Sequence, residues 1–302
     1  MKTNTYEKIT NAIIAKIESS GDLPWRKPWA AGANAPRNLV SKKTYRGINI
    51  VVLGMQGYSS PYWVTFKQCK DKGGRVKRGE KGTQVVFWKF GEKLTGELDE
   101  NGDEKKYTYA MLREYTVFNT DQCEGLKVPV EEKPANKIKP ITKCANIVRS
   151  FVHCPEIRHG RQEAFYSSHQ DYVNMPKFDT FDSAELYYSV LFHEVTHSTG
   201  HHRRLNRFAE EHSDHIFGSQ SYSKEELVAE MGAAYLCGVT GIENKIINNS
   251  SAYIKSWLRA LKNDKKMLIY AAAKAQRAAD YIQNITHEVK DKEGSEKKLQ
   301  VA

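Results

Sequence analysis

The stretch His193-Glu194-Val195-Thr196-His197 decides how the second half of this chain is expected to fold and what chemistry it carries. Two histidines four residues apart lie one turn apart on the same face of an α-helix, so both imidazoles can reach one metal ion. A glutamate directly after the first histidine lies beside the open coordination position of such a site. The pattern predicts a Zn²⁺ site for metal-assisted hydrolysis, most often of a peptide bond.

The residues around this pentapeptide have the pattern of a capped helix. Asp182 and Ser183 are two candidate N-caps, and Glu185 can complete a capping box. Apolar residues recur at helical spacing ahead of the histidines, and Gly200 is the predicted C-cap. The histidines are therefore expected on the buried face of a helix over 183–199. Two core histidines flanking a solvated glutamate are the alternative that the pattern leaves open.

A catalytic zinc usually has three protein ligands, so a third one must come from elsewhere in the chain. The metzincin pattern HExxHxxGxxH would place a histidine at position 203, where this chain has Arg203. His201 and His202 are the right residue type at the wrong spacing. The metzincin arrangement is therefore not expected.

A better candidate for the third ligand lies in the stretch KEELVAEMGAA at 224–234. Glu226 and Glu230 are four residues apart on one helical face, which resembles the gluzincin arrangement. There a glutamate on a second helix binds the metal, and an acid four residues later orients a ligand histidine. By that spacing Glu226 is the expected ligand and Glu230 the orienting acid. The two roles can be exchanged, Glu225 is a further candidate, and a solvated acidic face is the alternative.

In such a site Glu194 would take a proton from the attacking water and pass it to the leaving amine. A further electrophile is expected to stabilise the oxyanion. The candidates, among which the sequence does not choose, are Tyr222, His212, His215 and Tyr235. The extended residues 171–175 are a candidate edge strand for pairing with a peptide substrate, although an ordinary place in a sheet is equally consistent.

Length and composition predict a two-domain protein of the cytoplasm. The chain has 302 residues, of which 40% are hydrophobic, and no apolar run approaches the roughly 20 residues of a membrane span. Its first 20 residues lack the apolar core of a signal peptide and have the pattern of an amphipathic helix. The 5 cysteines are dispersed without a CxxC pair, which favours a reducing compartment. No membrane partner is expected.

Positive charge is concentrated in the first third of the chain. Residues 1–90 contain 17 Lys and Arg against 5 Asp and Glu, whereas the remaining residues contain 29 against 31. The net charge of +10 thus belongs to the N-terminal region. Such a distribution is typical of a surface that binds a polyanion.

Local patterns divide the chain into two regions of different fold. Strands are expected over 62–69, 84–90 and 107–119, with an exposed loop at 91–104. Helices are expected over 142–153, 224–237 and 250–285, with a β segment at 163–175. Three prolines and several charges between them predict a linker. The predicted fold is α+β, with an N-terminal mixed α/β nucleic-acid-binding domain at 1–125, a linker at 126–140, and a mainly helical, zincin-like domain with a small sheet at 141–302.

The N-terminal region interleaves aromatic and cationic residues, as proteins that bind single-stranded nucleic acid do. Four of the five tryptophans lie in residues 1–90. Rings can stack on bases while Lys and Arg meet phosphates, so weak sequence preference is expected. The predicted DNA-binding residues are Trp25, Arg26, Lys27, Trp29, Lys43, Tyr45, Arg46, Asn49, Trp63, Lys67, Lys77, Arg78, Lys81 and Trp88. The alternative is a basic surface over a domain whose tryptophans are core.

Several motifs together resemble one known family, the ArdC-type antirestriction proteins. In the first half these are PWRKPW at 24–29, YRGIN at 45–49, WVTFKQ at 63–68 and GEKGT at 79–83. In the second half they are HEVTHSTGH at 193–201, RRLNR at 203–207 and EELVAE at 225–230. The resemblance implies an N-terminal domain that binds single-stranded DNA and a C-terminal zincin-like metallopeptidase domain. It also implies carriage by mobile elements such as conjugative plasmids and protection of entering DNA from restriction.

The leading interpretation is a protein that binds single-stranded DNA and has a zinc-dependent peptidase-like site near DNA-bound protein targets. Zn²⁺ is the expected cofactor, with Mn²⁺ or another divalent metal as the alternative. A second interpretation is a DNA-coating protein whose metal site is structural or vestigial. A third, a metal-dependent nuclease, fits poorly, because nucleases prefer carboxylate-rich and often two-metal sites.

Overall fold

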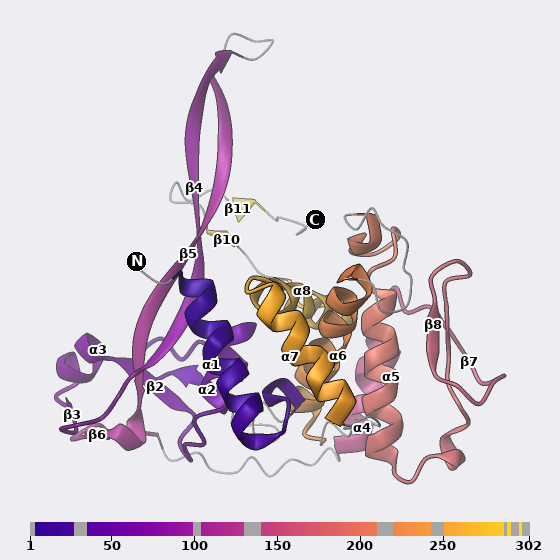
Figure 1. Ribbon diagram of the computed structural model, residues 1–302, viewed down its shortest axis with the longest axis horizontal. Coiled ribbons are helices and arrows are strands. Elements are labelled where there is room, and N and C mark those ends of the chain that lie inside the picture. Colours follow the sequence, from indigo (N-terminus) through magenta and orange to yellow (C-terminus); the bar gives the residue numbers. More distant parts are fainter. Residues whose placement is uncertain are drawn as a thin grey trace.

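The computed structural model describes residues 4–26, 35–98, 104–129, 140–209, 220–242, 251–286, 289–290 and 296–297. A sheet-bearing region, a central group of helices and a small second sheet follow one another across the molecule (Figure 1). The first sheet belongs to the N-terminal half and the second to the C-terminal half. This is the predicted α+β fold, with a sheet-rich N-terminal part and a mainly helical C-terminal part. None of the helices in the described ranges has both the length and the apolar character needed to cross a bilayer.

The chain begins with the predicted amphipathic helix, α1 (Thr5–Ser20). The Asn4 side chain accepts a hydrogen bond from the backbone N–H of Tyr6, and Gly21 closes the helix at φ 68°. The isoleucines at 9, 13, 14 and 17 are buried. They face α7 (Ser251–Asn263) and α8 (Met267–Ile282), so the N-terminus packs on the C-terminal helices.

The first sheet has the strand order β1-β2-β5-β4. Its strands are β1 (Arg37–Asn38), β2 (Tyr62–Thr65), β4 (Thr83–Leu98) and β5 (Glu104–Asn119). Strand β1 runs parallel to β2, and the other pairs are antiparallel. Strands β4 and β5 form a long hairpin that projects from the body of the molecule (Figure 1). Residues 91–98, predicted as loop, therefore continue the strand.

Short elements complete the N-terminal half. They are the 3₁₀ turns Pro24–Arg26 and Thr120–Gln122, α2 (Ile48–Gly54), α3 (Phe66–Asp71), and the paired strands β3 (Arg75–Val76) and β6 (Cys123–Glu124). The strand predicted over 62–69 ends at Thr65. There Thr65 and Gln68 form a reciprocal capping box that starts α3 instead. Helix α2 was not predicted.

The C-terminal half combines long helices with a three-stranded sheet of order β7-β9-β8. Its remaining elements are α4 (Pro140–Ser150), β7 (Glu156–Arg158), β8 (Phe165–Ser167), β9 (Tyr172–Asn174), the 3₁₀ turns Phe178–Thr180 and Arg207–Ala209, α5 (Ala184–Ser198) and α6 (Gln220–Thr240). Two short strands, β10 (Val289–Lys290) and β11 (Glu296–Lys297), pair near the C-terminus.

The single helix predicted over 250–285 is wrong, because the chain forms two helices there. The Asp264 carboxylate accepts hydrogen bonds from the backbone N–H groups of Lys266 (3.0 Å) and Met267 (3.1 Å). It thereby satisfies donors at the start of α8 and ends the preceding helix. The break lets α7 face α1 while α8 packs against α6.

One hydrophobic core spans both halves of the chain. It contains Ile13 and Trp25 from the N-terminal region together with Leu227, Met231 and Leu268 from the C-terminal helices. Two smaller clusters lie within the first sheet region. The predicted boundary at 126–140 stays a prediction, and residues 130–139 of it lie outside the described ranges.

Candidate metal centre

The helix that carries the two histidines is α5, and it begins where the sequence predicts. The Ser183 hydroxyl accepts a hydrogen bond from the backbone N–H of Leu186 at 3.2 Å. At the other end Thr199 is the C-cap, so the prediction of Gly200 was one residue late. A Cβ at Gly200 would lie 2.4 Å from the Phe208 ring, so close packing requires glycine there.

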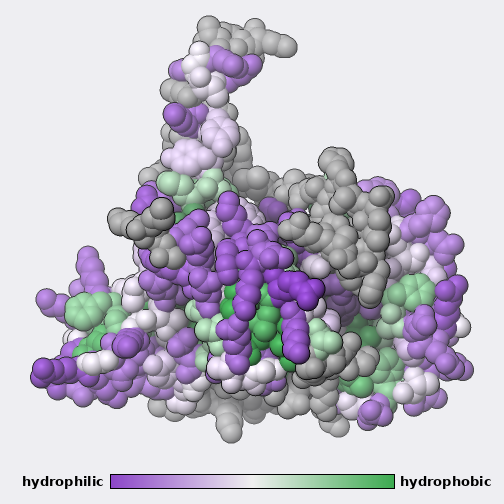
Figure 2. All heavy atoms as spheres, viewed as in Figure 1, coloured by the Kyte–Doolittle hydropathy of each residue, from purple (hydrophilic) through white to green (hydrophobic). Residues whose placement is uncertain are grey.

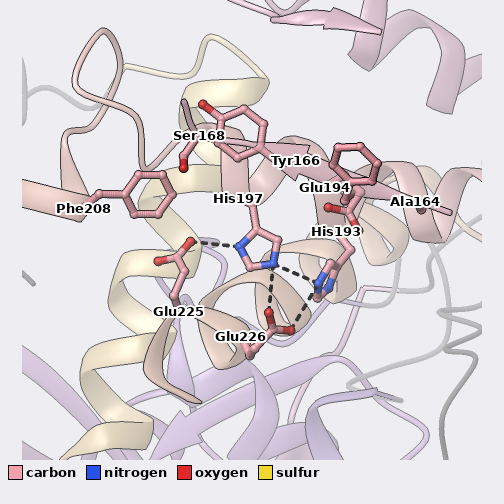
Figure 3. A pocket seen from close by; sticks show the side chains of 10 residues that line it. Ala164, Tyr166, Ser168, His193, Glu194, His197, Phe208, Glu225 and Glu226 are labelled. Carbon is pink, nitrogen blue, oxygen red and sulfur yellow. Dashed lines mark hydrogen bonds and ion pairs between the residues drawn. The ribbon is translucent and has the colours of Figure 1, made fainter. Parts of the chain in front are cut away.

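Helix α6 lies against α5 and brings an acidic turn to the histidines. At Gly232 an added Cβ would lie 2.5 Å from Cγ2 of Thr196, which is fully buried on α5. Glycine therefore permits close approach of the two helices at this level. Six residues earlier on α6, Glu226 faces His193 and His197 (Figure 3).

Three side chains converge with the geometry of a metal site. The Nε2 atoms of His193 and His197 are 3.1 Å apart. The Glu226 carboxylate oxygens lie 3.5 Å from Nε2 of His193 and 3.4 Å from Nε2 of His197. A tetrahedron with bonds of about 2.1 Å has edges of about 3.4 Å, so these atoms can serve as three of its corners. Among the described residues, these three form a candidate metal centre.

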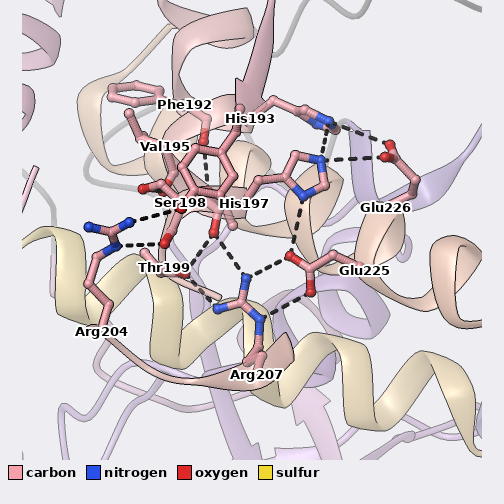
Figure 4. Close-up of polar contacts among 12 residues, drawn as sticks. Phe192, His193, Val195, His197, Ser198, Thr199, Arg204, Arg207, Glu225 and Glu226 are labelled. Carbon is pink, nitrogen blue, oxygen red and sulfur yellow. Dashed lines mark hydrogen bonds and ion pairs between the residues drawn. The ribbon is translucent and has the colours of Figure 1, made fainter. Parts of the chain in front are cut away.

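The acid that orients His197 is Glu225, not the predicted Glu230. Nδ1 of His197 lies 3.2 Å from Oε1 of Glu225. Arg207 holds that carboxylate through both oxygens, with Nη2 at 2.7 Å and Nε at 3.2 Å (Figure 4). Arg207 is itself fixed by Thr199 Oγ1 at 2.6 Å and the Thr196 carbonyl at 3.0 Å. Adjacent positions on α6 thus supply the candidate ligand, Glu226, and the acid that orients His197, Glu225.

Glu230 lies one turn of α6 beyond Glu226, where its side chain meets the N-terminal segment and does not reach His197. It is 1% exposed and accepts hydrogen bonds from Nε1 of Trp25 at 2.8 Å and from the Tyr253 hydroxyl. Its role is therefore to join the chain's two halves, and the prediction of Glu230 as the orienting acid was wrong.

The electrostatics of the cluster favour a bound cation. Burial lowers the pKa of His197, but the carboxylates of Glu225 and Glu226 outweigh burial and raise it to about 10. Burial raises the pKa of Glu226, yet hydrogen bonds to His193 and His197 hold it below its usual range. Two imidazoles and two carboxylates placed so closely attract positive charge, which either protons or a metal ion can supply.

A cavity of about 410 Å³ opens over these residues. It is lined by Ala164, Phe165, Tyr166, Ser168, His193, Glu194, His197, Phe208, Glu225 and Glu226 (Figure 3). Glu194, 8% exposed, reaches the same cavity as the candidate ligands, as the HExxH pattern predicts.

The strand that borders the cavity is β8, not the predicted stretch 171–175. Strand β9 lies in the middle of its sheet, between β7 and β8, so its backbone hydrogen-bonding groups are engaged on both sides. Strand β8 is the edge strand on the cavity side, where Phe165 and Tyr166 line the cavity. A substrate strand would thus find its open partner at β8.

Two of the other residues considered for the site, Tyr235 and His201, lie away from the metal cluster. Tyr235 is 2% exposed in the core and does not line the cavity. His212 and His215 lie outside the described residues, and the side chain of Tyr222 is likewise not described. His201 is buried, with Nδ1 3.7 Å from Asp171, and does not join the metal cluster.

The aromatic residues predicted to stack on DNA are mostly core residues. Trp25 is 0%, Trp63 2% and Tyr45 5% exposed, so their rings have no free face for a base. Asn49 is also buried, where it exchanges two hydrogen bonds with the backbone of Val86. Trp88 is half-buried between the rings of Tyr6 and Tyr270. For the four buried residues the prediction of direct DNA contact was wrong, because tertiary packing covers their side chains, whereas for Trp88 it stays a prediction.

The predicted cations are more accessible. Exposed among them are Lys43, Lys67, Lys77, Arg78 and Lys81. Arg46 is also exposed but forms an ion pair with Asp280 of α8, so part of its charge is neutralised. Lys27 and Trp29 lie outside the described residues, and the side chain of Arg26 is not described.

Sequence reasoning missed Arg207 as the partner of Glu225 and the exposed aromatic residues of the β4–β5 hairpin. Arg207 carried one usable signal, its place in the RRLNR motif. The aromatic residues at 107, 109 and 115 are separated by even numbers of residues, which predicts a common strand face.

Comparison with known proteins gives matches over both halves. Residues 3–118 match the N-terminal domain of anti-restriction factor ArdC, and residues 150–275 match a zincin-like metallopeptidase family. The chain is 35% identical over 298 residues to DNA primase TraC of Escherichia coli, of which it covers 27%. It is 35% identical to the uncharacterised protein y4eC of Sinorhizobium fredii, of which it covers 92%.

Solved structures give a match over nearly the whole chain. The metal-free crystal structure of antirestriction protein ArdC from plasmid R388 superposes with a TM-score of 0.72 at 39% identity, covering 94% of this chain and 98% of that one. The Mn(II)-bound structure of the same protein superposes with a TM-score of 0.72 at 38% identity. This chain therefore belongs to the ArdC family of antirestriction proteins, with the family's N-terminal domain followed by a zincin-like metallopeptidase domain.

Proposed function

We propose that this protein is a metal-dependent peptide hydrolase that binds single-stranded DNA and protects DNA entering a cell. The observation that carries the hydrolase proposal is the convergence of His193, His197 and Glu226 beneath a cavity that also contains Glu194. A purely structural metal site has no need of a carboxylate beside an open cavity.

The donor set fits zinc, with other divalent metals as alternatives. Two imidazoles and one carboxylate are a common ligand set of catalytic zinc, and their spacing leaves a fourth position toward the cavity. Mn²⁺ also binds such donors, and the ArdC structure from R388 was obtained with Mn(II). When bound, the metal would polarise the scissile carbonyl and acidify water.

Each residue of the site then has a distinct task. Glu194 takes the proton from water and delivers it to the leaving amine. Glu225, held by Arg207, fixes the ring orientation of His197 so that Nε2 faces the cavity. The edge of β8 aligns an extended substrate beside the site.

The N-terminal region supplies the second part of the proposed function. Its excess of basic residues and its match to the ArdC N-terminal domain support binding of single-stranded DNA. Relatives named DNA primase contain the same kind of segment, which supports a role on DNA. Binding to the strand would raise the concentration of the hydrolase near DNA-bound proteins.

The substitution Glu194→Gln tests the catalytic proposal. The amide has nearly the shape of the carboxylate but is no base, so we expect unchanged metal content and a loss of peptide hydrolysis of about 10²-fold or more. The same variant should fail to protect entering DNA in a restriction-proficient recipient. Glu163→Gln, in the loop before β8, is a matched control. If Glu194→Gln protects DNA as well as the wild type, the protein acts by coating DNA and the hydrolase proposal is wrong.

A further inference from the structure

The β4–β5 hairpin presents two faces of different character. Residues that lie opposite each other in an antiparallel pair point to the same face of the sheet. The register of β4 and β5 therefore shows on which face of the hairpin each side chain lies. One face carries the rows Val85–Tyr115, Phe87–Arg113, Lys89–Met111, Gly91–Tyr109 and Lys93–Tyr107. We name these five rows the aromatic face of the hairpin.

Large apolar and aromatic side chains are left in solvent on this face. Tyr107 is 58%, Tyr115 50%, Phe87 45% and Met111 38% exposed. Figure 2 shows apolar and weakly polar side chains interspersed with hydrophilic ones along the projecting arm. Exposed rings grouped in this way mark an interaction surface.

The rings are arranged by the hairpin itself. The rings of Phe87 and Tyr115 are 5.6 Å apart, and those of Tyr107 and Tyr109 are 6.5 Å apart at an interplanar angle of 27°. A Cβ at Gly91 would lie 2.7 Å from Cζ of Tyr109, so this ring lies across the glycine of the opposite strand. Glycine thus lets the ring lie against the strand and leaves its outer side for a ligand.

Charge separates the two faces. The aromatic face contains the exposed cations Lys89, Lys93 and Arg113 and no acidic residue in its five rows. The opposite face carries Glu114, which pairs with Lys8 of α1 at 3.0 Å. That face therefore helps to dock the hairpin on the body, whereas the aromatic face combines rings with positive charge.

We propose that the aromatic face of the hairpin is the surface on which single-stranded DNA stacks. This inference rests on the proposed DNA binding and names its location. Bases would stack on Tyr107, Tyr109, Phe87 and Tyr115, while Lys89, Lys93 and Arg113 meet phosphates. This face carries positive charge and no acidic residue, so it fits a polyanion better than a neutral protein partner.

The dimensions of the face suit a short stretch of strand. Successive rows are about 6.8 Å apart, so the five rows span about 27 Å. This row spacing is about twice the axial rise of about 3.4 Å per nucleotide in a B-form strand. Each row therefore meets every second nucleotide of a stacked strand, or successive nucleotides of a stretched one.

Affinity for a labelled oligothymidylate of about 20 nucleotides, measured by fluorescence anisotropy, tests the proposal. Tyr115→Ala and Tyr107→Ala should each weaken binding by about 5- to 150-fold. Phe90→Ala is the matched control, because Phe90 is 68% exposed on the opposite face of the same hairpin. It should bind as the wild type does. Equal metal content and thermal unfolding would show that the variants are folded.

The salt dependence of DNA binding distinguishes the contribution of the aromatic rings from that of the cationic side chains. Arg113→Ala and Lys89→Ala should each reduce the slope of log K against log salt by about 0.7, whereas Tyr115→Ala should leave the slope unchanged. If the wild type binds and the aromatic-face variants bind equally well, the location is wrong and the DNA-binding function stands. If the wild type does not bind the oligonucleotide, both proposals are overturned.

Discussion

At the scale of single residues, Asp171 shows how a partly buried charge supports the region beside the metal centre. Its carboxylate forms an ion pair with Arg204 and accepts a hydrogen bond from the Tyr166 hydroxyl at 2.8 Å. Arg204 also donates to the Ser198 carbonyl at 2.6 Å, at the end of α5. Asp171 therefore links the small sheet to the helix that carries both histidines.

The stability that Asp171 contributes should depend on pH. Burial raises its pKa, but hydrogen bonds from Arg204 and Tyr166 outweigh burial and hold it below its usual range. A carboxyl group with a lowered folded-state pKa stabilises the fold above its unfolded-state pKa of about 3.9. That contribution is lost as the pH falls through the lower folded-state value.

We therefore expect Asp171→Asn to lower the free energy of unfolding by roughly 3 kcal/mol near neutral pH. The difference from wild type should persist at pH 5 and narrow below about pH 4. Urea unfolding of the metal-free protein measures it. Asp179→Asn, at an exposed position in the nearby 3₁₀ turn, should have little effect. A difference that stays constant down to pH 3 would contradict the ion-pair argument.

At the scale of elements, the contact between α5 and α6 determines whether the metal centre forms. His193 and His197 come from α5, and Glu226 comes from α6. The helices meet where Gly232 faces Thr196, whose hydroxyl donates to the Phe192 carbonyl at 2.6 Å. A branched, fully buried side chain cannot move aside easily.

Gly232→Ala should therefore separate the two helices. Overpacking of this kind costs about 1–3 kcal/mol of stability. Because Glu226 would shift relative to the histidines, we expect divalent-metal affinity to fall by about tenfold or more. Titration with Zn²⁺ against a competing chelator measures it. The pair Gly232→Ala with Thr196→Ser removes the methyl group that clashes and should restore part of the affinity. Wild-type affinity in Gly232→Ala alone would contradict this account.

The elements also show where local patterns were sufficient. The α5 and α1 helices formed as predicted, because their caps and apolar spacing agree with their packing. Residues 62–69 and 250–285 differed from prediction, because the Thr65 and Asp264 side chains cap new helices within stretches of unbroken periodicity. A capping residue is a weak signal beside such a pattern until its hydrogen bonds are seen.

At the scale of the whole molecule, the N-terminal region belongs to the same core as the metallopeptidase helices. The indole N–H of Trp25 donates a hydrogen bond to the Glu230 carboxylate on α6. The isoleucines of α1 pack against the core that includes α8. Burying one such side chain contributes about 1.5–3 kcal/mol. Removing the N-terminal region would expose the surfaces of α6 and α8 that it covers.

We accordingly expect residues 141–302 alone to be less soluble and to retain less metal than the full chain. Circular dichroism and metal content after purification measure this outcome, and addition of a fragment of residues 1–125 should restore both. A stable fragment of residues 141–302 with one metal per chain would show that the halves are independent.

The sequence by itself determined the elements that carry chemistry: the HExxH helix, an acidic second helix and a basic N-terminal region. Helical periodicity and charge are local properties, so they are readable without coordinates. Only the tertiary structure decided which acid orients His197, which strand borders the cavity and which aromatic residues remain exposed. Each depends on packing between distant segments, which placed Glu230 under Trp25, β9 between two strands, and Trp25 and Trp63 in the core.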